Sequence, residues 1–448
     1  MAVLPSNLHL ASNAAITAAL SNLRLTYNGR NAWLDPGANK YIVDSIEEIK
    51  SDITASTLNS AHITDYMATS VLIHCFNGWT YLSNAINSLL EGDFGNAIHN
   101  AYYAELRSIF SILGSQGIGV YDRNNVLIDQ HGTAHRVTPI KIATHVFAKN
   151  AFDEWLNNPS NRQTILSLFT VEGSSLQEWI LHSGLSSELS GELAATKLKQ
   201  WSLDIAVIHN EQKFRNYVSY NPLRFNMAPP AIADNIENRL NFITDLWKLC
   251  APDQLFSYSI LRNTYENLYG TMNYSLTDLD MKADWERLFT DIGKNVNDAQ
   301  SQTLIRFLRR DINTSENLVF NYADTINVSS PIIEQDIEPF GIISRACIML
   351  LLNTKIIESV LRQSGTSKND LKFWFDNIGL KSGLWNSATE PNSFADLWAD
   401  VEIDIDDINS WISDPTKTLD PFNYKNDLKS STSHIRNFAK AYLWNSGL

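Results

Sequence analysis

Apolar residues recur every three or four positions along most of this chain, and this spacing constrains the fold more than any other feature. The segments 63–93, 94–113 and 341–365 show it most clearly. Residues 117–129, "GIGVYDRNNVLID", break the pattern with two short β-type runs around a turn rich in Asp and Asn. The sequence therefore predicts a mainly α fold, a multi-helix bundle with one small β-hairpin inserted near residues 117–129.

The length of 448 residues exceeds what one hydrophobic core usually serves, so we expect more than one domain. The stretch "YNPLRFNMAPPAIADN" contains three prolines and no helical period. It predicts an N-terminal helical domain over residues 1–222 and a linker or crossing loop over 223–235. A C-terminal helical domain would follow over 236–448.

Charge and cysteine content narrow the functional classes. The formal net charge is -14, which disfavours a surface that coats nucleic acid, because phosphate neutralisation needs clustered Lys and Arg. Cys75, Cys250 and Cys347 are far apart and odd in number, which argues against a disulfide framework and a thiolate metal site. The apolar run "ACIMLLL" is too short to span a membrane. We expect a cytoplasmic protein with no membrane contact.

The segment "HNAYYAELRSIF" carries the first group of candidate site residues. On a helical wheel Glu105 lies inside the apolar stripe, Arg107 lies nearly opposite, and His99 lies between the two faces. Glu105 and His99 are candidate acid/base residues, and Arg107 is a candidate anion-binding residue. The alternative is structural: a buried carboxyl needs a cation, a hydrogen-bond partner or a proton, so Glu105 would anchor a buried network.

The segment "LDIAVIHNEQKFRNYVSYNPLR" carries the second group. Glu211 and Arg215 are four residues apart, which predicts an ion pair within the helix. His209 borders the apolar face and is either a third catalytic candidate or an ordinary core histidine. Arg215, Tyr220 and Arg224 combine guanidinium groups with an aromatic ring, as phosphate contact and base stacking require. Ordinary packing where the helix ends would use the same residues.

Other motifs predict neither a metal nor a cofactor. His131 and His135 follow Asp129, but Gly132 and Thr133 between them disfavour a helix that would align three ligands. The run "GSQGIG" follows a helix, whereas a dinucleotide loop follows a strand. The densest basic run, "RFLRRD" at 306–311, is either a phosphate-binding group or a solvated helix face.

The run "HNAYYAELRSIFSILGSQGIGVY", followed later by "HNEQKFRNYVSYNP", resembles the HEPN-like helical proteins of prokaryotic defence and abortive-infection systems. The resemblance covers roughly residues 60–222 and implies a helical fold and a role in anti-phage defence. Nuclease members of that family carry an arginine, four to six residues, and then a histidine. No pair here has that spacing; Arg136 and His145, for example, have eight residues between them. The ribonuclease motif therefore cannot be placed on this chain.

Three functional hypotheses follow. The first is an interaction or regulatory protein whose partner is a second copy or the product of an adjacent gene. The second is a metal-independent ribonuclease or nucleotide-acting enzyme, which requires His99, Glu105 or Arg107 to lie within about 4 Å of His209 or Arg215. The third is a non-catalytic module that binds RNA or another nucleic acid.

Overall fold

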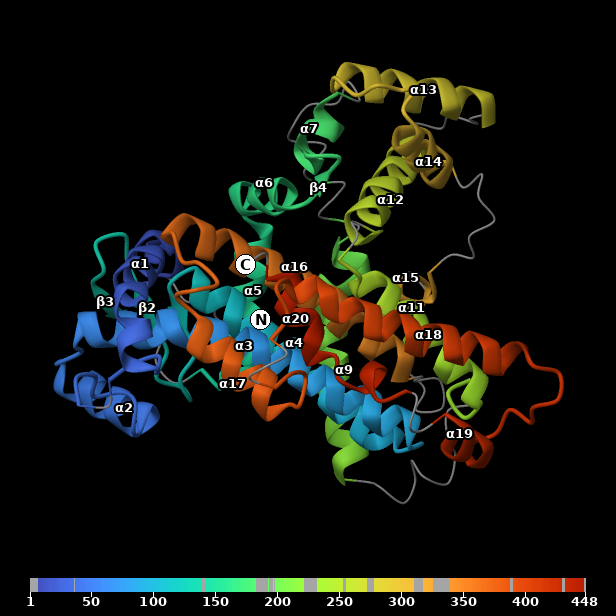
Figure 1. Cartoon of the computed structure of the whole chain (residues 1–448). Coiled ribbons are helices and arrows are strands. Elements are labelled where there is room, and N and C mark those ends of the chain that lie inside the picture. Colours follow the sequence, from blue (N-terminus) through green and yellow to red (C-terminus); the bar gives the residue numbers. More distant parts are fainter. Residues whose placement is uncertain are drawn as a thin grey trace.

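The structure is a computed structural model of the 448-residue chain (Figure 1). It describes residues 7–35, 37–138, 142–182, 192, 196, 198–220, 232–252, 255–271, 278–309, 317–324, 339–386, 390–428 and 432–446. The fold is mainly α, as predicted. Most of the predicted linker, and Arg224 with it, lies outside the described residues.

The first half contains a short 3₁₀ turn, eight α-helices, one π-helical turn and five short strands among its described residues. Their bounds are η1 Leu8–Leu10, α1 Asn13–Arg30, α2 Ser45–Ala55, α3 Ser60–Leu90, α4 Phe94–Ser115, β1 Ile118–Gly119, β2 Val126–Ile128, β3 Ala134–Arg136, α5 Thr144–Asn157, α6 Pro159–Leu168, β4 Thr170–Val171, β5 Ser174–Ser175, α7 Leu176–Leu181 and η2 Lys199–Leu203. The helix α9 follows over Ile205–Tyr220.

The second half is helical throughout its described residues. Its elements are α11 Ile236–Cys250, α12 Leu255–Thr271, α13 Asp278–Asp291, α14 Ala299–Leu308, α15 Leu318–Ala323, α16 Pro339–Ser364, α17 Lys372–Lys381, η4 Phe394–Leu397, α18 Trp398–Ser413, α19 Pro421–Asp427, η5 His434–Arg436 and α20 Ala439–Asn445.

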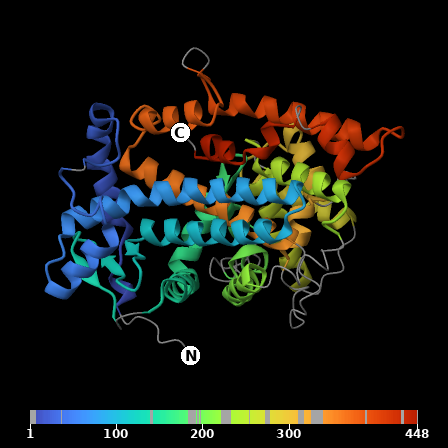
Figure 2. The same ribbon diagram turned by 90° about the horizontal axis from the view of Figure 1, so that it is seen from below.

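Helices α3 and α4 form a long antiparallel pair at the centre of the fold, seen in blue and cyan in Figure 2. Side chains cap both starts: the Asn59 side chain accepts a hydrogen bond from His62 N, and that of Asp93 accepts one from Asn96 N. Gly92 joins the two helices with a φ of 79°, a conformation that glycine adopts without strain. The pair provides the surface on which later helices pack.

Helix α16 packs against both α3 and α4. One described helix, α16 itself, is long and apolar enough to cross a membrane by length and composition, and 89% of that stretch is buried inside the fold. Trp79 on α3 donates its indole N–H to Thr354 Oγ1 on α16 at 3.0 Å. Helix α20 also contacts α3, where Ala439 N donates to Ser83 Oγ at 2.9 Å. The two halves of the chain thus share one hydrophobic core, and the predicted division at 223–235 stays a prediction.

The predicted hairpin is present and carries a third strand. Strand β1 pairs antiparallel with β2, with Ile118 opposite Leu127, and β2 pairs antiparallel with β3, with Leu127 opposite His135. Asp122 and Arg123 make the first turn with positive φ angles of 32° and 68°. A second, two-stranded hairpin, β4–β5, was not predicted.

Gly78 sets how closely α3 approaches its neighbours. A Cβ on Gly78 would lie 2.6 Å from Leu350 Cδ2 on α16 and 3.3 Å from the carbonyl oxygen of Ala104 on α4. Both distances are shorter than ordinary contacts, so these three helices meet at a point where only hydrogen fits.

We expect Gly78→Val to lower the free energy of unfolding by about 1–3 kcal/mol, because the added carbons overpack this contact. Gly29→Val is the matched control: Gly29 is also helical, but a Cβ added there would meet nothing within 4 Å. Its stability should change by less than about 0.5 kcal/mol, since Val and Gly differ little in helix propensity. Denaturant unfolding compares the two, and equal losses would contradict the close packing.

Candidate functional site

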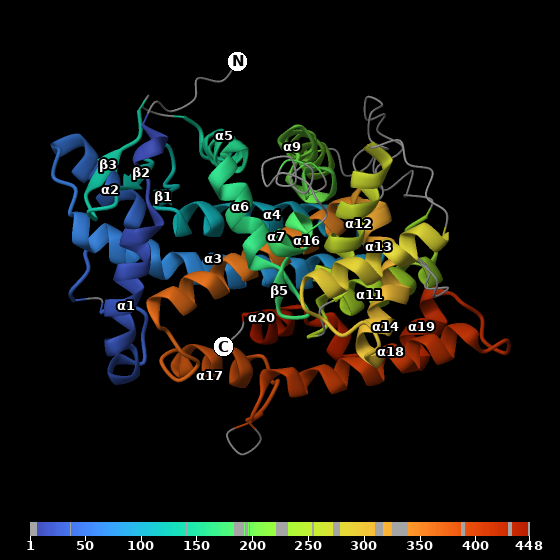
Figure 3. The same cartoon turned by 90° about the horizontal axis from the view of Figure 1, so that it is seen from above.

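The candidate site lies where α4, α5, α9 and α16 meet, and these helices adjoin one another in Figure 3. Each helix places one charged side chain in this junction. The four residues, which we call the buried ionic cluster, are Glu105, Lys149, Glu211 and Arg345. All four are almost fully buried. Removing four charges from water is costly unless they pair or change protonation state, so their arrangement decides what the junction can do.

Glu105 lies on the buried face of α4, as its wheel position predicts, and is 0% exposed. As a carboxylate it would be unsatisfied, because neither of its oxygens accepts a hydrogen bond from a donor in the described part of the chain. Burial raises the pKa of Glu105 well above its ordinary value, and the nearby charge of Glu211 and a hydrogen bond with that carboxyl raise it further. Arg345 and Lys149 oppose this shift. The balance of these effects favours the protonated form of Glu105.

Glu211 is the ionised partner. Its Oε1 accepts hydrogen bonds from Nε of Arg345, at 2.6 Å, and from Nη2 of the same guanidinium. Its Oε2 has no partner among the described donors. A protonated Glu105 supplies the missing donor, because a neutral carboxyl carries one O–H. The proton on Glu105 and the guanidinium of Arg345 thus provide hydrogen bonds for the carboxyl groups of Glu105 and Glu211. These bonds connect α4, α9 and α16.

The predicted Glu211–Arg215 ion pair is wrong. Arg345 reaches Glu211 from α16 inside the core, where an ion pair is less screened than on a helix surface. Arg215 instead donates to Tyr103 Oη at 2.7 Å and to Asn216 Oδ1 at 2.9 Å. The ion pair between two helices thus takes the place of an i,i+4 ion pair within α9, which would stabilise the helix by only about 0.2–0.5 kcal/mol.

Lys149 completes the cluster from α5. Its Nζ donates to the carbonyl oxygen of Ile208 at 3.0 Å and to Gln212 Oε1 at 2.8 Å, both on α9. Burial lowers the pKa of Lys149 to about 8, while Glu105 and Glu211 act in the opposite direction. Lys149 therefore stays largely protonated at neutral pH and holds α5 against α9.

An aromatic group lies between the cluster and the surface. The Arg215 guanidinium carbon lies 5.3 Å from the ring centre of Tyr102 and 5.1 Å from that of Tyr103, within cation–π range. Tyr102 Oη is 2.9 Å from His145 Nδ1. His99 packs on Tyr103 with ring centres 4.9 Å apart, and its Nδ1 is 3.3 Å from Ser219 Oγ. Burial and the charge of Arg215 lower the pKa of His99, so this histidine is neutral at pH 7.

The structure brings together only some of the sequence candidates. Glu105 and Arg215 both act on the pKa of Tyr102, and Arg215 acts on that of His99, so these three candidates share one region. Arg107 points the other way, with Nη1 3.1 Å from His74 Nδ1 on α3. His209 is near Lys149 and Asp153. Tyr220 is 78% exposed at the end of α9.

The sequence analysis did not identify Lys149 and Arg345 as site residues, although the sequence around each of them indicates a buried charge. Both are single basic residues inside strongly apolar helical runs, "HVFAKNAF" and "GIISRACIMLLL". A lone charge in such a run must find a partner on folding. The wheel position of Glu105 does not say which of the other helices covers it, so neither residue could be paired with it from the pattern alone.

No group of three metal-ligating side chains occurs in the described ranges. His131 and His135 lie close to Asp129 in and beside the turn between β2 and β3. Asp129 Oδ1 accepts hydrogen bonds from His131 N and Thr133 N, and its Oδ2 is 2.7 Å from His135 Nε2. These contacts hold the pKa of Asp129 down at about 2. Asp129 and His135 thus stabilise the turn between β2 and β3.

Comparison with known proteins gives no match: no family model, curated protein or solved structure is similar to this chain. The class that the fold defines is therefore a mainly α protein with a buried ionic cluster at a four-helix junction.

We expect Glu105→Gln to flatten the pH dependence of stability. The pKa of Glu105 is about 4.3 when unfolded and higher when folded, so above about pH 5 the native state binds more protons than the unfolded state. The proton on Glu105 stabilises the wild-type native state fully when the pH is below the unfolded pKa. This stabilisation decreases by up to about 1.4 kcal/mol per pH unit as the pH rises toward the folded pKa. Glutamine donates to Glu211 without binding a proton, so its variant lacks this slope. Denaturant unfolding between about pH 5 and 8 measures it.

Glu211→Gln in the Glu105→Gln background is the matched comparison, because Glu105 then cannot take over as the anion. It leaves Arg345 buried without a counter-charge and should cost about 3–5 kcal/mol beyond the single variant. Parallel pH profiles for wild type and Glu105→Gln, or a second substitution without further loss, would contradict the assigned protonation states.

Proposed function

We propose that this chain is a helical interaction or regulatory protein that acts in the cytoplasm by binding a second protein with a basic surface. We also propose that the pair belongs to a prokaryotic defence system. The likeness of residues 60–222 to HEPN-like proteins supports the second part. The outer surface of α18 supports the first and is the observation that carries the proposal.

Helix α18 has two distinct faces. Its inner face buries Val401, Ile405 and Ile408, and Asp404 beside them accepts hydrogen bonds from the backbone N–H of His434 at 2.7 Å and Ile435 at 3.1 Å. The helix lies along the outside of the molecule in Figures 1 and 3. Its other face is therefore available to a partner.

The outer face of α18 consists of Glu402, Ile403, Asp406, Asn409 and Ser410, all of them exposed. Within the described residues Glu402 and Asp406 take part in no ion pair, and Ile403 between them is 61% exposed. Unpaired acids around an exposed apolar side chain suit a partner that supplies Lys or Arg around an apolar contact. A second copy meeting this face with the same face would place acids against acids, so we propose a different, basic protein.

The buried ionic cluster supports a scaffold rather than a reaction centre. Arg345 forms an ion pair with Glu211, and Lys149 donates to the backbone of α9. Glu105 is 0% exposed. Such a network holds α4, α5, α9 and α16 in fixed relative positions.

The two alternatives depend on residues that the fold has enclosed or engaged. A ribonuclease-like site built from Glu105, His99 and His209 would need all three to reach one substrate, whereas Glu105 is enclosed. A nucleic-acid-binding module would use Arg215, whose guanidinium already contacts Tyr103 Oη and two rings. The interaction proposal uses groups that are exposed and unpaired in the described structure.

We expect Glu402→Lys/Asp406→Lys to abolish co-purification with the product of an adjacent gene when the two are expressed together. Charge reversal should weaken binding at least tenfold by replacing attraction with repulsion. The matched control is Glu48→Lys/Asp291→Lys, which makes the same charge change at exposed positions on α2 and α13. Retention of every partner by the α18 variant, or equal loss in the control, would contradict the proposal.

A further inference from the structure

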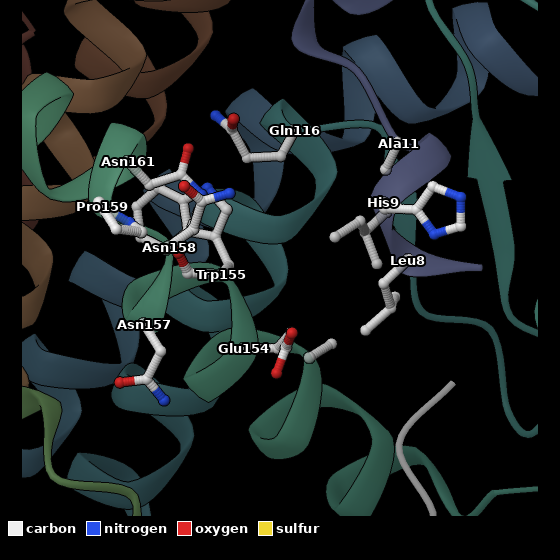
Figure 4. A pocket seen from close by; sticks show the side chains of 12 residues that line it. Leu8, His9, Ala11, Gln116, Glu154, Trp155, Asn157, Asn158, Pro159 and Asn161 are labelled. Carbon is white, nitrogen blue, oxygen red and sulfur yellow. Dashed lines mark hydrogen bonds between the residues drawn. The ribbon is translucent and has the colours of Figure 1, made fainter. Parts of the chain in front are cut away.

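A cavity of about 550 Å³ lies between the N-terminal segment and the corner where α5 meets α6 (Figure 4). It is bordered by η1, by the end of α4, by β1 and by residues 151–161. This volume falls within the range of small-molecule sites. The cavity does not involve α18 or the buried ionic cluster, so its interpretation is independent of the proposed function.

The walls combine an apolar base with uncharged polar groups. Ile118 and Ala151 are buried and line one part of it. Figure 4 shows Gln116 and Glu154 facing the open space, with Asn158 and Asn161 on one side and η1 on the other. Among the described lining residues there is no Lys or Arg, and Glu154 is the only carboxylate.

Trp155 gives the most specific indication of a ligand. Its side chain is 8% exposed and lines the cavity, and its indole N–H is buried without an acceptor in the described structure. Buried donors are normally paired, as Trp179 shows by donating to the carbonyl oxygen of Val171 at 3.0 Å. Trp33, Trp285 and Trp374 also have unpaired indole N–H groups, but none of these three lines this cavity. Trp155 is thus an unpaired indole whose side chain forms part of a cavity wall.

Hydrogen bonds fix the amides around Trp155 and leave one polar atom of each available. Asn161 Nδ2 donates to the Trp155 carbonyl oxygen at 2.8 Å, and Gln116 Nε2 donates to Ser115 Oγ at 3.1 Å. Asn158 Oδ1 accepts from Ser160 N at 3.0 Å. The carbonyl oxygens of Asn161 and Gln116 remain as acceptors, and the amide nitrogen of Asn158 remains as a donor. With Glu154 and Trp155, the cavity offers donors and acceptors in alternation.

The hydrogen-bond donors and acceptors in the cavity wall indicate which class of ligand fits. An anion such as a phosphate meets no Lys or Arg in the described wall, and the ring of Trp155 is covered, so that the exposed His9 imidazole is the ring that the described wall presents. A hydroxyl group donates and accepts at once and matches neighbouring amides and a carboxylate. We propose that this cavity binds a neutral hydroxylated ligand, a sugar of one or two rings, beside the Trp155 side chain.

Fluorine NMR of the full chain labelled with 5-fluorotryptophan tests this directly. The chain has 12 Trp, and Trp155→Phe and Trp179→Phe assign two of their resonances by deletion. A panel of neutral mono- and disaccharides is then titrated into the wild-type chain, with inorganic phosphate and spermidine as charged probes. We expect a sugar to shift the Trp155 resonance saturably while that of Trp179, whose N–H is already bound, stays still.

Gln116→Ala should weaken the same sugar's binding about tenfold, equivalent to about 1.4 kcal/mol, by removing one acceptor. Saturation transfer to the sugar compares wild type with this variant even if Trp155→Phe fails to fold. The proposal is overturned if no sugar in the panel moves the Trp155 resonance, if only phosphate or spermidine moves it, or if Gln116→Ala binds the sugar unchanged.

Discussion

The centre of this fold depends on how two carboxyls are accommodated away from water. Glu105 and Glu211 are more than a hundred residues apart in sequence, and two ionised carboxylates in one dry junction would repel. One proton on Glu105 and one guanidinium from Arg345 remove the conflict. Glu105 donates to Glu211, and Glu211 accepts from Arg345, so removing any one of the three leaves a buried polar group without a hydrogen-bond partner. The contact that joins α4, α9 and α16 is then lost.

Helical periodicity was enough to predict the fold class, the hairpin near residues 117–129 and the buried face of α4. It placed Glu105 inside and Arg107 opposite, and both positions are confirmed. It could not identify Arg345, because a wheel specifies the face of a helix but not which helix covers it. The third strand of the sheet was missed for a similar reason: Ala134–Arg136 is short, and its pairing with β2 is a tertiary contact.

The two proposed contacts lie outside the buried ionic cluster. Within the cluster Glu211 and Arg345 form an ion pair, and Gly78 lets α3, α4 and α16 approach closely. The outer face of α18 carries the proposed protein contact, and the cavity lined by Trp155 carries the proposed ligand.

The central claim is that Glu105 carries a proton at neutral pH inside a fully folded chain. The infrared difference spectrum between wild type and Glu105→Gln at pH 7 measures this directly, because a protonated carboxyl and a carboxylate have separate stretching bands. The account predicts that the wild type shows a protonated-carboxyl band that the variant lacks, with the carboxylate bands unchanged. Loss of carboxylate intensity in the variant, with no protonated-carboxyl difference, would show that Glu105 is ionised and would contradict the account.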